Sequence, residues 1–125
     1  MGRFEFCFVN DRLISKASAR IDPTDRGFAL GDALFETMRV REGRVVNLNA
    51  HLERLIRASE LLGFGSVPDA HALSVAVEDT RAANDIVDGV LRLTVTRGSG
   101  GRGLAVADEL RPTVVGVGSP RPMRP

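Results

Sequence analysis

Apolar and polar residues alternate along several short stretches of the chain, which is the pattern of half-buried β-strands. The clearest examples are residues 90–96 (VLRLTVT) and residues 34–40 (LFETMRV). The second stretch runs into Glu42-Gly43, a pair that favours a two-residue hairpin turn because glycine tolerates positive φ. A returning strand is therefore predicted at residues 45–48. Further strands are predicted at residues 4–9, at 12–15 and from residue 114 (VVGVG), with a short extended piece at 17–21.

Two segments show helical instead of alternating spacing. Leu52, Leu55, Ile56, Ser59 and Leu62 recur on one helix face, which predicts a helix over residues 49–62. Its start is assigned to Asn49 as N-cap and its end to Gly63 at the position after the C-cap. A second amphipathic helix is predicted over residues 70–83, with Asp69 as its N-cap.

These elements predict an α+β fold, an antiparallel sheet of about six strands with two helices on one side. Short connections join neighbouring strands, and helices do not alternate with every strand as in a βαβ series. The short stretches Asp25-Arg26-Gly27 and Gly31-Asp32 are interpreted as turns. Residues 1–118 form one domain in this reading, and residues 119–125 (SPRPMRP) have the composition of a linker.

Composition excludes several classes of partner. The net charge is only +1, so no strong field points to nucleic acid or a membrane surface. An arginine-rich nucleic-acid-binding module is a weaker reading, because basic residues are not clustered and the chain has no Trp or Tyr. Neither His51 nor His71 has a second ligand at metal-binding spacing. No signal peptide or apolar run of membrane length is found, and a single buried Cys7 fits a reducing compartment, so a cytoplasmic location is expected.

Arg54 is the first candidate for binding chemistry. Arg57 has Glu53 and Glu60 at helical offsets, so we expect it to be paired on an exposed face. Arg54 has no carboxylate at those offsets, and its five-donor guanidinium suits a bidentate anion such as phosphate. An ordinary surface arginine is the alternative interpretation, and the spacing alone does not decide between them.

The glycine loop RGSGGRG, residues 97–103, is the second candidate. Its glycines allow backbone N–H groups to approach an anion, and Arg97 and Arg102 add positive charge. It is not a P-loop, because it lacks the Lys-Ser/Thr ending and no helix signal follows it. A plain connection between two strands is an equally good reading.

The motif GFALGDALFETMRV, followed by a hairpin and the H-x-x-R-L helix, resembles the N-terminal small domain of fold-type IV pyridoxal-phosphate enzymes. This class IV family includes branched-chain and D-amino acid aminotransferases and aminodeoxychorismate lyases. The resemblance implies that Arg54 binds the cofactor phosphate, that Phe35 lines the substrate pocket and that Arg102 contacts a substrate carboxylate. Arg39 has the same strand parity as Phe35, which makes it a further substrate-contact candidate, with pairing to a carboxylate as the alternative. Leu104 stands where the family often has His or Tyr, which argues against a standard D-amino acid aminotransferase.

The same resemblance also predicts what this chain lacks. In the family, the lysine that forms a Schiff base with pyridoxal 5′-phosphate belongs to a C-terminal domain, which we expect to be absent here. The only lysine, Lys16, lies outside every motif and is expected at the surface. We therefore expect no catalytic residue and no covalently bound cofactor in the chain alone, which is predicted to be inactive. Expected partners are a small amino acid or aminodeoxychorismate-like substrate, the missing domain and a second copy in a homodimer.

Two functional readings stay open. In one, the chain is part of a lyase-like or aminotransferase-like enzyme, including a D-amino acid or branched-chain aminotransferase. In the other, it is a non-catalytic remnant that acts as a binding or dimerisation module.

Overall fold

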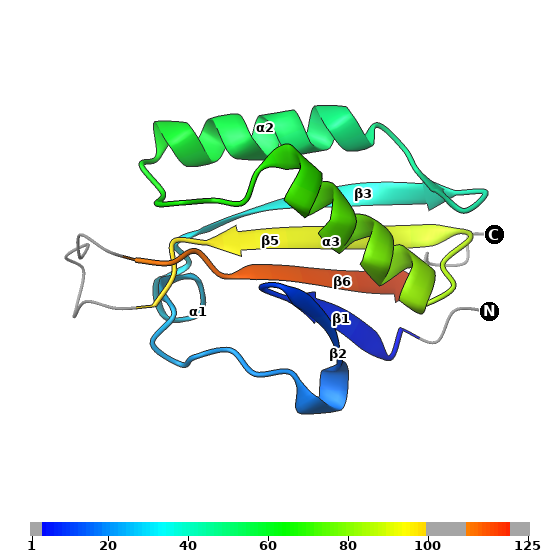
Figure 1. The fold of residues 1–125 in the computed structure, drawn as a ribbon, viewed down its shortest axis with the longest axis horizontal. Coiled ribbons are helices and arrows are strands. Elements are labelled where there is room, and N and C mark those ends of the chain that lie inside the picture. The colour runs from blue at the N-terminus through cyan, green and yellow to red at the C-terminus, as the bar shows by residue number, and fades with distance from the viewer. Residues whose placement is uncertain (1–3, 100–109, 121–125) are drawn as a thin grey trace.

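The computed structural model describes residues 4–99 and 110–120 of the 125-residue chain. Within these residues, six strands form one antiparallel sheet in the order β2-β1-β6-β5-β3-β4 (Figure 1). The strands are β1 (Phe6–Val9), β2 (Arg12–Ser15), β3 (Ala33–Arg41), β4 (Arg44–Val45), β5 (Gly89–Thr96) and β6 (Val114–Pro120). The predicted antiparallel α+β class is confirmed.

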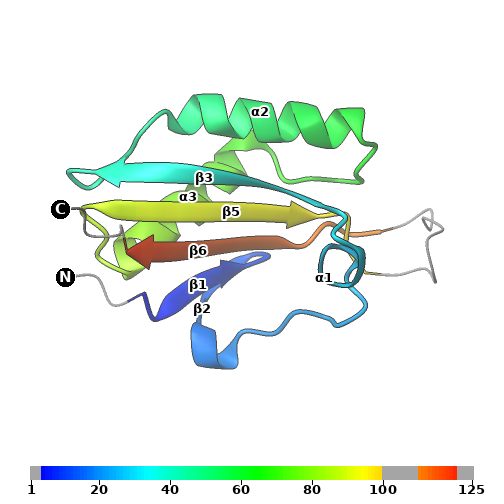
Figure 2. The same ribbon diagram turned by 180° about the vertical axis from the view of Figure 1, so that it is seen from behind.

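Two long helices, α2 (Leu48–Leu61) and α3 (Ala70–Ala83), cover one face of this sheet and leave the other face bare (Figures 1 and 2). Their buried residues at helical spacing pack on inward-facing strand residues such as Met38, Leu91 and Leu93. The core therefore lies between the helix layer and one sheet face. No helix in the described part of the chain is long and apolar enough to cross a membrane.

Local sequence explains the turn of the β3–β4 hairpin and the C-terminus of α2. Glu42 and Gly43 both have positive φ, 52° and 74°, the conformation of the tight turn whose twist matches that of paired strands. At the C-terminus of α2, Gly63 has φ 71° and its N–H donates to the carbonyl of Glu60, while the N–H of Phe64 donates to that of Ser59. This pair of bonds satisfies carbonyls that the last helical turn leaves free. The predicted roles of Glu42-Gly43 and Gly63 are confirmed.

Some predicted boundaries were wrong. The returning strand β4 has two residues instead of four, and α2 begins at Leu48, so Asn49 is inside the helix and is not its N-cap. Asn47 turns the chain into the helix with φ 56°, a left-handed conformation that asparagine tolerates well. By contrast, Asp69 caps α3 as predicted, and its side chain accepts a hydrogen bond from Ala72 N.

A short helix, α1 (Arg26–Leu30), was missed where the sequence indicated turns. The Asp25 side chain accepts a hydrogen bond from the Gly27 N–H and caps α1, and Gly31 ends it with φ 70°. Five residues are too few to show a helical period, so only turn signals were visible. The predicted extended piece at 17–21 begins instead as a 3₁₀ turn, η1 (Lys16–Ser18).

The two ends of the sheet also differ slightly from prediction. Strand β1 begins at Phe6 instead of residue 4. Strand β6 continues through Ser119 and Pro120, which pair with Val90 and Gly89, so these two residues are not linker. The rest of the predicted linker, residues 121–125, lies outside the described residues. Cys7 is buried as expected, and this burial raises the pKa of its thiol.

Candidate functional site

Strand β3 presents different chemistry on its two faces. Its register with β5 pairs Met38 with Leu91 and Glu36 with Leu93, which places the even-numbered side chains toward the helices. The odd-numbered residues, Phe35 among them, face the bare side of the sheet, and Phe35 is 53% exposed. The candidate residues on β3 are therefore divided between the helix-covered face and the open face.

On the helix-covered face, Glu36 meets His51 and Arg54 from α2. Arg54 Nε donates to both carboxylate oxygens of Glu36, at 3.2 and 3.0 Å, and Nη2 donates to Oε1 at 2.6 Å. His51 Nδ1 lies 2.6 Å from Oε1, at hydrogen-bond distance. His51 and Arg54 are three residues apart and so lie on the same helix face. We call these three residues the open cluster.

The charges of the open cluster support one another. Burial alone would raise the pKa of Glu36, but the hydrogen bonds and positive charges of Arg54 and His51 outweigh it and leave this pKa below its ordinary value. The hydrogen bonds and charge of Glu36 in turn raise the pKa of Arg54. Glu36 is thus ionised at neutral pH and can only accept hydrogen bonds, which explains why His51 Nδ1 is the donor.

Arg54 keeps hydrogen-bonding capacity for an external group. A guanidinium has five N–H donors. The contacts with Glu36 use one N–H on Nε and one on Nη2. In the described part of the chain, both N–H groups of Nη1 and the second of Nη2 have no partner. The Arg54 side chain is 70% exposed. The expectation from helical spacing that Arg54 lacks a carboxylate partner was wrong, because Glu36, which is 18 residues away in sequence, is that partner.

On the open face, the guanidinium of Arg92 stacks over the Phe35 ring, with Cζ 3.7 Å from the ring centroid. Arg92 and Thr94 come from β5, and with Phe35, Phe28 and Val115 they line a hollow of about 410 Å³. This surface combines an aromatic ring, a cation and a threonine hydroxyl around one concavity. Sequence reasoning missed Arg92, although it has a polar position in the alternating stretch VLRLTVT.

Arg39 does share the face of Phe35, but it has other partners. Its Nη1 forms an ion pair with Asp88 and also donates to the carbonyl oxygens of Val40 at 2.8 Å and Gly89 at 3.3 Å. The residues that line the hollow do not include Arg39. These contacts agree with the alternative reading of Arg39, pairing with a carboxylate, more than with substrate contact.

Two other predictions concern arginines. The expected pairing of Arg57 with Glu53 and Glu60 was wrong, since none of the ion pairs among the described residues includes Arg57. Exposed pairs of this kind contribute little free energy, so their spacing alone does not hold them together. Arg102, the predicted substrate-carboxylate contact, lies outside the described residues, although the root of its loop at Arg97 and Gly98 is described.

A second group of polar residues lies at the end of the sheet near Arg97 and Gly98. It consists of two sets of hydrogen bonds, one around Asp25 and one around Asp32. In the first, Asp25 is fully buried and its Oδ2 accepts from Thr96 Oγ1 at 2.9 Å and from Thr113 Oγ1 at 2.6 Å. Its other oxygen caps α1 through Gly27 N. A single carboxylate thus joins α1, the end of β5 and the start of β6.

In the second set, Asp32 Oδ2 accepts from Arg26 Nε at 2.9 Å and from Arg97 Nε at 2.7 Å. Arg97 also donates from Nη1 to the Gly63 carbonyl and from Nη2 to the Leu62 carbonyl, at the C-terminus of α2. We call this group the closed network; its members are Asp25, Arg26, Asp32, Thr96, Arg97 and Thr113.

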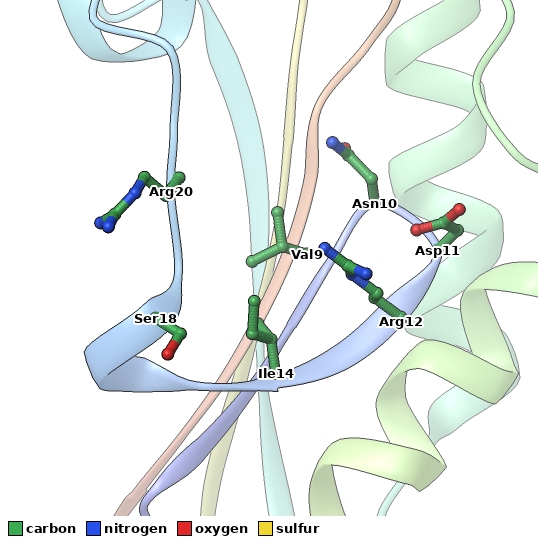
Figure 3. A pocket seen from close by; sticks show the side chains of 7 residues that line it. All are labelled: Val9, Asn10, Asp11, Arg12, Ile14, Ser18 and Arg20. Carbon is green, nitrogen blue, oxygen red and sulfur yellow. The ribbon is translucent and has the colours of Figure 1, made fainter.

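A further hollow of about 400 Å³ lies between the β1–β2 hairpin and the segment after η1. Figure 3 shows Arg12 leaning toward Val9, whereas Arg20 points away from the hairpin. The two arginines therefore do not converge on a common ligand, and this hollow is a weaker candidate than the surfaces around β3.

Comparison with known proteins shows the family of this chain. The sequence profile of the amino-transferase class IV family matches residues 33–125. The chain belongs to this family. Its members depend on pyridoxal phosphate, and the α+β fold described above is that of the small domain of fold-type IV aminotransferases.

Several class IV relatives cover most of the chain. The chain is 33% identical to an aminodeoxychorismate lyase of Bacillus subtilis over 110 residues, which is 86% of the chain. It is 27% identical to a D-alanine aminotransferase of Staphylococcus epidermidis over 95 residues, which is 76% of the chain. The crystal structure of 4-amino-4-deoxychorismate lyase from Pseudomonas aeruginosa superimposes with a TM-score of 0.78 at 39% identity over 95% of the chain. The branched-chain aminotransferase of Escherichia coli gives a TM-score of 0.86 over 95% of the chain at 17% identity, which supports the fold alone.

The chain corresponds to only part of these proteins. It spans 38% of the B. subtilis lyase, 34% of the S. epidermidis aminotransferase, and 41% and 42% of the two solved structures.

Proposed function

We propose that this chain is the small domain of a pyridoxal-phosphate enzyme of the class IV family, with aminodeoxychorismate lyase-like chemistry. Arg54 binds the cofactor phosphate, and the open face around Phe35 and Arg92 contacts the substrate. The observation that carries the proposal is the exposed guanidinium of Arg54, held in place by Glu36 with three N–H donors left over. The 39% identity to one solved lyase, against 27 to 32% to D-alanine aminotransferases of three bacteria, favours the lyase over the aminotransferase.

Arg54 fits a phosphate by the chemistry of its donors. A planar guanidinium with two adjacent N–H groups pairs with two oxygens of a phosphate at once. Because Glu36 already holds one side of the guanidinium, little side-chain entropy remains to be lost on binding. Bound pyridoxal phosphate would supply the electron sink for the reaction at the substrate. The chain's own contribution is to hold the phosphate and to shape the substrate side of the pocket.

Arg92 and Phe35 suit a substrate that carries both a carboxylate and a flat apolar part. The Arg92 guanidinium is available above the Phe35 ring on the exposed face, where it can pair with a carboxylate. The Phe35 ring offers a flat apolar surface beside that charge. An aminodeoxychorismate-like molecule has this combination of groups.

The Schiff-base lysine is the part that residues 1–125 do not supply in this proposal. Lys16 is exposed in η1, directly after β2, and β2 and β3 are separated in the sheet by β1, β6 and β5. Lys16 is therefore remote from both Arg54 and Phe35. We assign the lysine to a separate C-terminal domain. The small domain alone is then inactive. A non-catalytic binding module is the second reading, favoured by the same position of Lys16.

The open face also supports association with a second copy in a homodimer. Phe28 is 76% exposed beside the hollow that Phe35 lines, and Ile21 and Leu30 are also exposed. Exposed apolar groups of this size on one face mark surfaces that other protein covers.

The test is cofactor binding by the full-length protein after substitution of Arg54. Arg54→Ala removes a charge-assisted bidentate contact, so the affinity for pyridoxal phosphate should fall roughly ten- to a hundredfold. Equilibrium dialysis of the apoprotein against the cofactor measures this change. The Arg54→Ala variant should keep α2, because alanine is the better helix former.

Arg57→Ala is the matched control, one turn further along α2 on its exposed side and without an ion pair in the described part of the chain. It should leave cofactor affinity unchanged. Equal losses in the two variants, or a loss only in Arg57→Ala, would assign the phosphate to another group.

A further inference from the structure

Glu36 occupies a position where a charge is unfavourable. It lies on the helix-covered face of β3, between Leu34 and Met38 on the same face and opposite Leu93 of β5. Its side chain is only 8% exposed. A carboxylate removed from water is destabilising unless hydrogen bonds and opposite charges compensate for the lost hydration. An apolar residue would suit this position better if its only task were to pack β3 against α2.

In the described structure, the hydrogen bonds and positive charge that compensate for the lost hydration of Glu36 come from one face of α2. Glu36 accepts from His51 and, in bidentate fashion, from Arg54, and every protein side chain that it contacts through hydrogen bonds in the described structure belongs to that helix face. The two-point contact fixes the plane of the Arg54 guanidinium. It also directs the remaining donors of Arg54 outward, since the Glu36 side chain is buried and the Arg54 side chain is exposed.

We infer that Glu36 is a positioning residue for the anion site at Arg54, with His51 holding the carboxylate in place from its other side. This inference rests on the proposed function, in which the anion is the phosphate of pyridoxal phosphate. Glu36 does not touch the phosphate. It presents Arg54 in one orientation before the ligand arrives, which reduces the ordering that binding requires.

Two effects of the Glu36 charge act in opposite directions. Its negative charge repels a bound phosphate, but this repulsion acts across the guanidinium, at a rim exposed to water and salt, where it is screened. The orienting effect acts through direct hydrogen bonds of 2.6 to 3.2 Å that nothing screens. Orientation therefore outweighs repulsion, and loss of the Glu36 carboxylate should weaken phosphate binding.

The experiment compares pyridoxal phosphate with pyridoxal, which lacks the phosphate, as ligands of the full-length apoprotein. The ratio of the two affinities isolates the contribution of the phosphate from general damage to the fold. E36Q keeps the shape of the side chain but removes its charge and replaces one acceptor oxygen with a donor. The ratio should fall about tenfold, as for other residues that orient a ligand-binding group, while the affinity for pyridoxal changes less than about twofold.

E36D separates orientation from charge and serves if E36Q does not fold. It keeps the negative charge but shortens the side chain, so under the inference it also lowers the ratio. If repulsion dominated, E36Q would raise the ratio and E36D would leave it unchanged. Either result overturns the inference, as does an equal loss of affinity for both ligands, which is the signature of a merely structural role.

Two further variants distinguish the possible failures. Asp32→Asn disturbs the half-buried carboxylate that binds Arg26 and Arg97 in the closed network, so it should lower the thermal unfolding temperature without changing the ratio. Arg54→Ala tests the proposed function itself. If Arg54→Ala lowers the ratio and both Glu36 variants leave it unchanged, only the inference about Glu36 is wrong. If Arg54→Ala leaves it unchanged, the phosphate site is elsewhere and both are wrong.

Discussion

The closed network and the open cluster are built from the same pair of groups, arginine and carboxylate, yet they differ in what the arginine has left to offer. Asp32 in the closed network binds Arg26 and Arg97, whose side chains are only 9% and 14% exposed. Arg97 directs Nε, Nη1 and Nη2 at protein acceptors and stacks on the Phe64 ring. In the open cluster, Arg54 is 70% exposed and only one side of its guanidinium is engaged.

In our proposal, this difference separates structural arginines from Arg54, the arginine assigned to ligand binding. Arg97 satisfies the carbonyl oxygens at the end of α2 and ties them to Asp32 at the start of β3, so its hydrogen bonds hold elements together. Arg54 is held by Glu36 on one side, and its other donors have no partner among the described residues. We therefore expect substitutions in the closed network to lower stability and those in the open cluster to affect ligand binding.

The largest effect on stability is expected for Asp32→Ala. The substitution removes the carboxylate that compensates two nearly buried guanidinium groups, so the free energy of unfolding should fall by about 3–4 kcal/mol. Urea unfolding followed by circular dichroism measures this change. Glu78→Ala is the control, because its pair with Arg81 is a partly exposed pair within one helix, α3, and should contribute less than about 1 kcal/mol. Similar losses in the two variants would contradict the structural role of the closed network.

Asp25→Ala should be the next most destabilising change. It removes the N-cap of α1, which contributes about 1 kcal/mol, and leaves the hydroxyls of Thr96 and Thr113 without their acceptor, at about 1–3 kcal/mol. We expect a loss of about 2–4 kcal/mol in the same unfolding measurement. Asp25→Asn keeps one acceptor oxygen and the cap, so it should recover part of this loss. No recovery would mean that the charge of Asp25, and not its hydrogen bonds, matters.

The smallest expected effect is the pH dependence of stability, to which both the closed network and the open cluster contribute. Burial alone would raise the pKa of Asp32 and of Glu36, but the hydrogen bonds and charges of their arginines outweigh it and lower both. The unfolded chain therefore binds these protons more readily than the folded one. The resulting stability is fully present above the ordinary pKa values, about 4, and is lost as pH falls through the lowered folded values.

Urea midpoints measured from pH 7 down to pH 3 should consequently decrease below about pH 4. The decrease should be shallower in Asp32→Ala and in E36Q, since each variant lacks one of the two carboxyl groups. An unchanged slope in both variants would assign the acid sensitivity to other groups.

The strands and long helices were predictable from sequence because their signals are local. Residues 34–40 alternate with a period of two, and this alternation already assigns Glu36 and Met38 to one side and Phe35 to the other. Asp69 and Gly63 bound their helices through hydrogen bonds to residues only a few positions away. Where the local signal was short, as in the five residues of α1, the prediction was wrong.

The family motif also reached Arg54 and Phe35 from the sequence, but it could not indicate their surroundings. Glu36 is 18 residues from Arg54, and Asp88 is 49 residues from Arg39. Arg92 was not a candidate until the pairing of β3 with β5 placed it beside Phe35.

By itself, then, the sequence determined most of the strands, the two long helices and the class of protein. Only the tertiary structure decided which arginine is held on one side and which on all sides. The physical reason is range: strand alternation, helix caps and turns depend on residues a few positions apart. The partners of a guanidinium are whatever carboxylates and carbonyl oxygens the packed helices and sheet bring within about 3 Å.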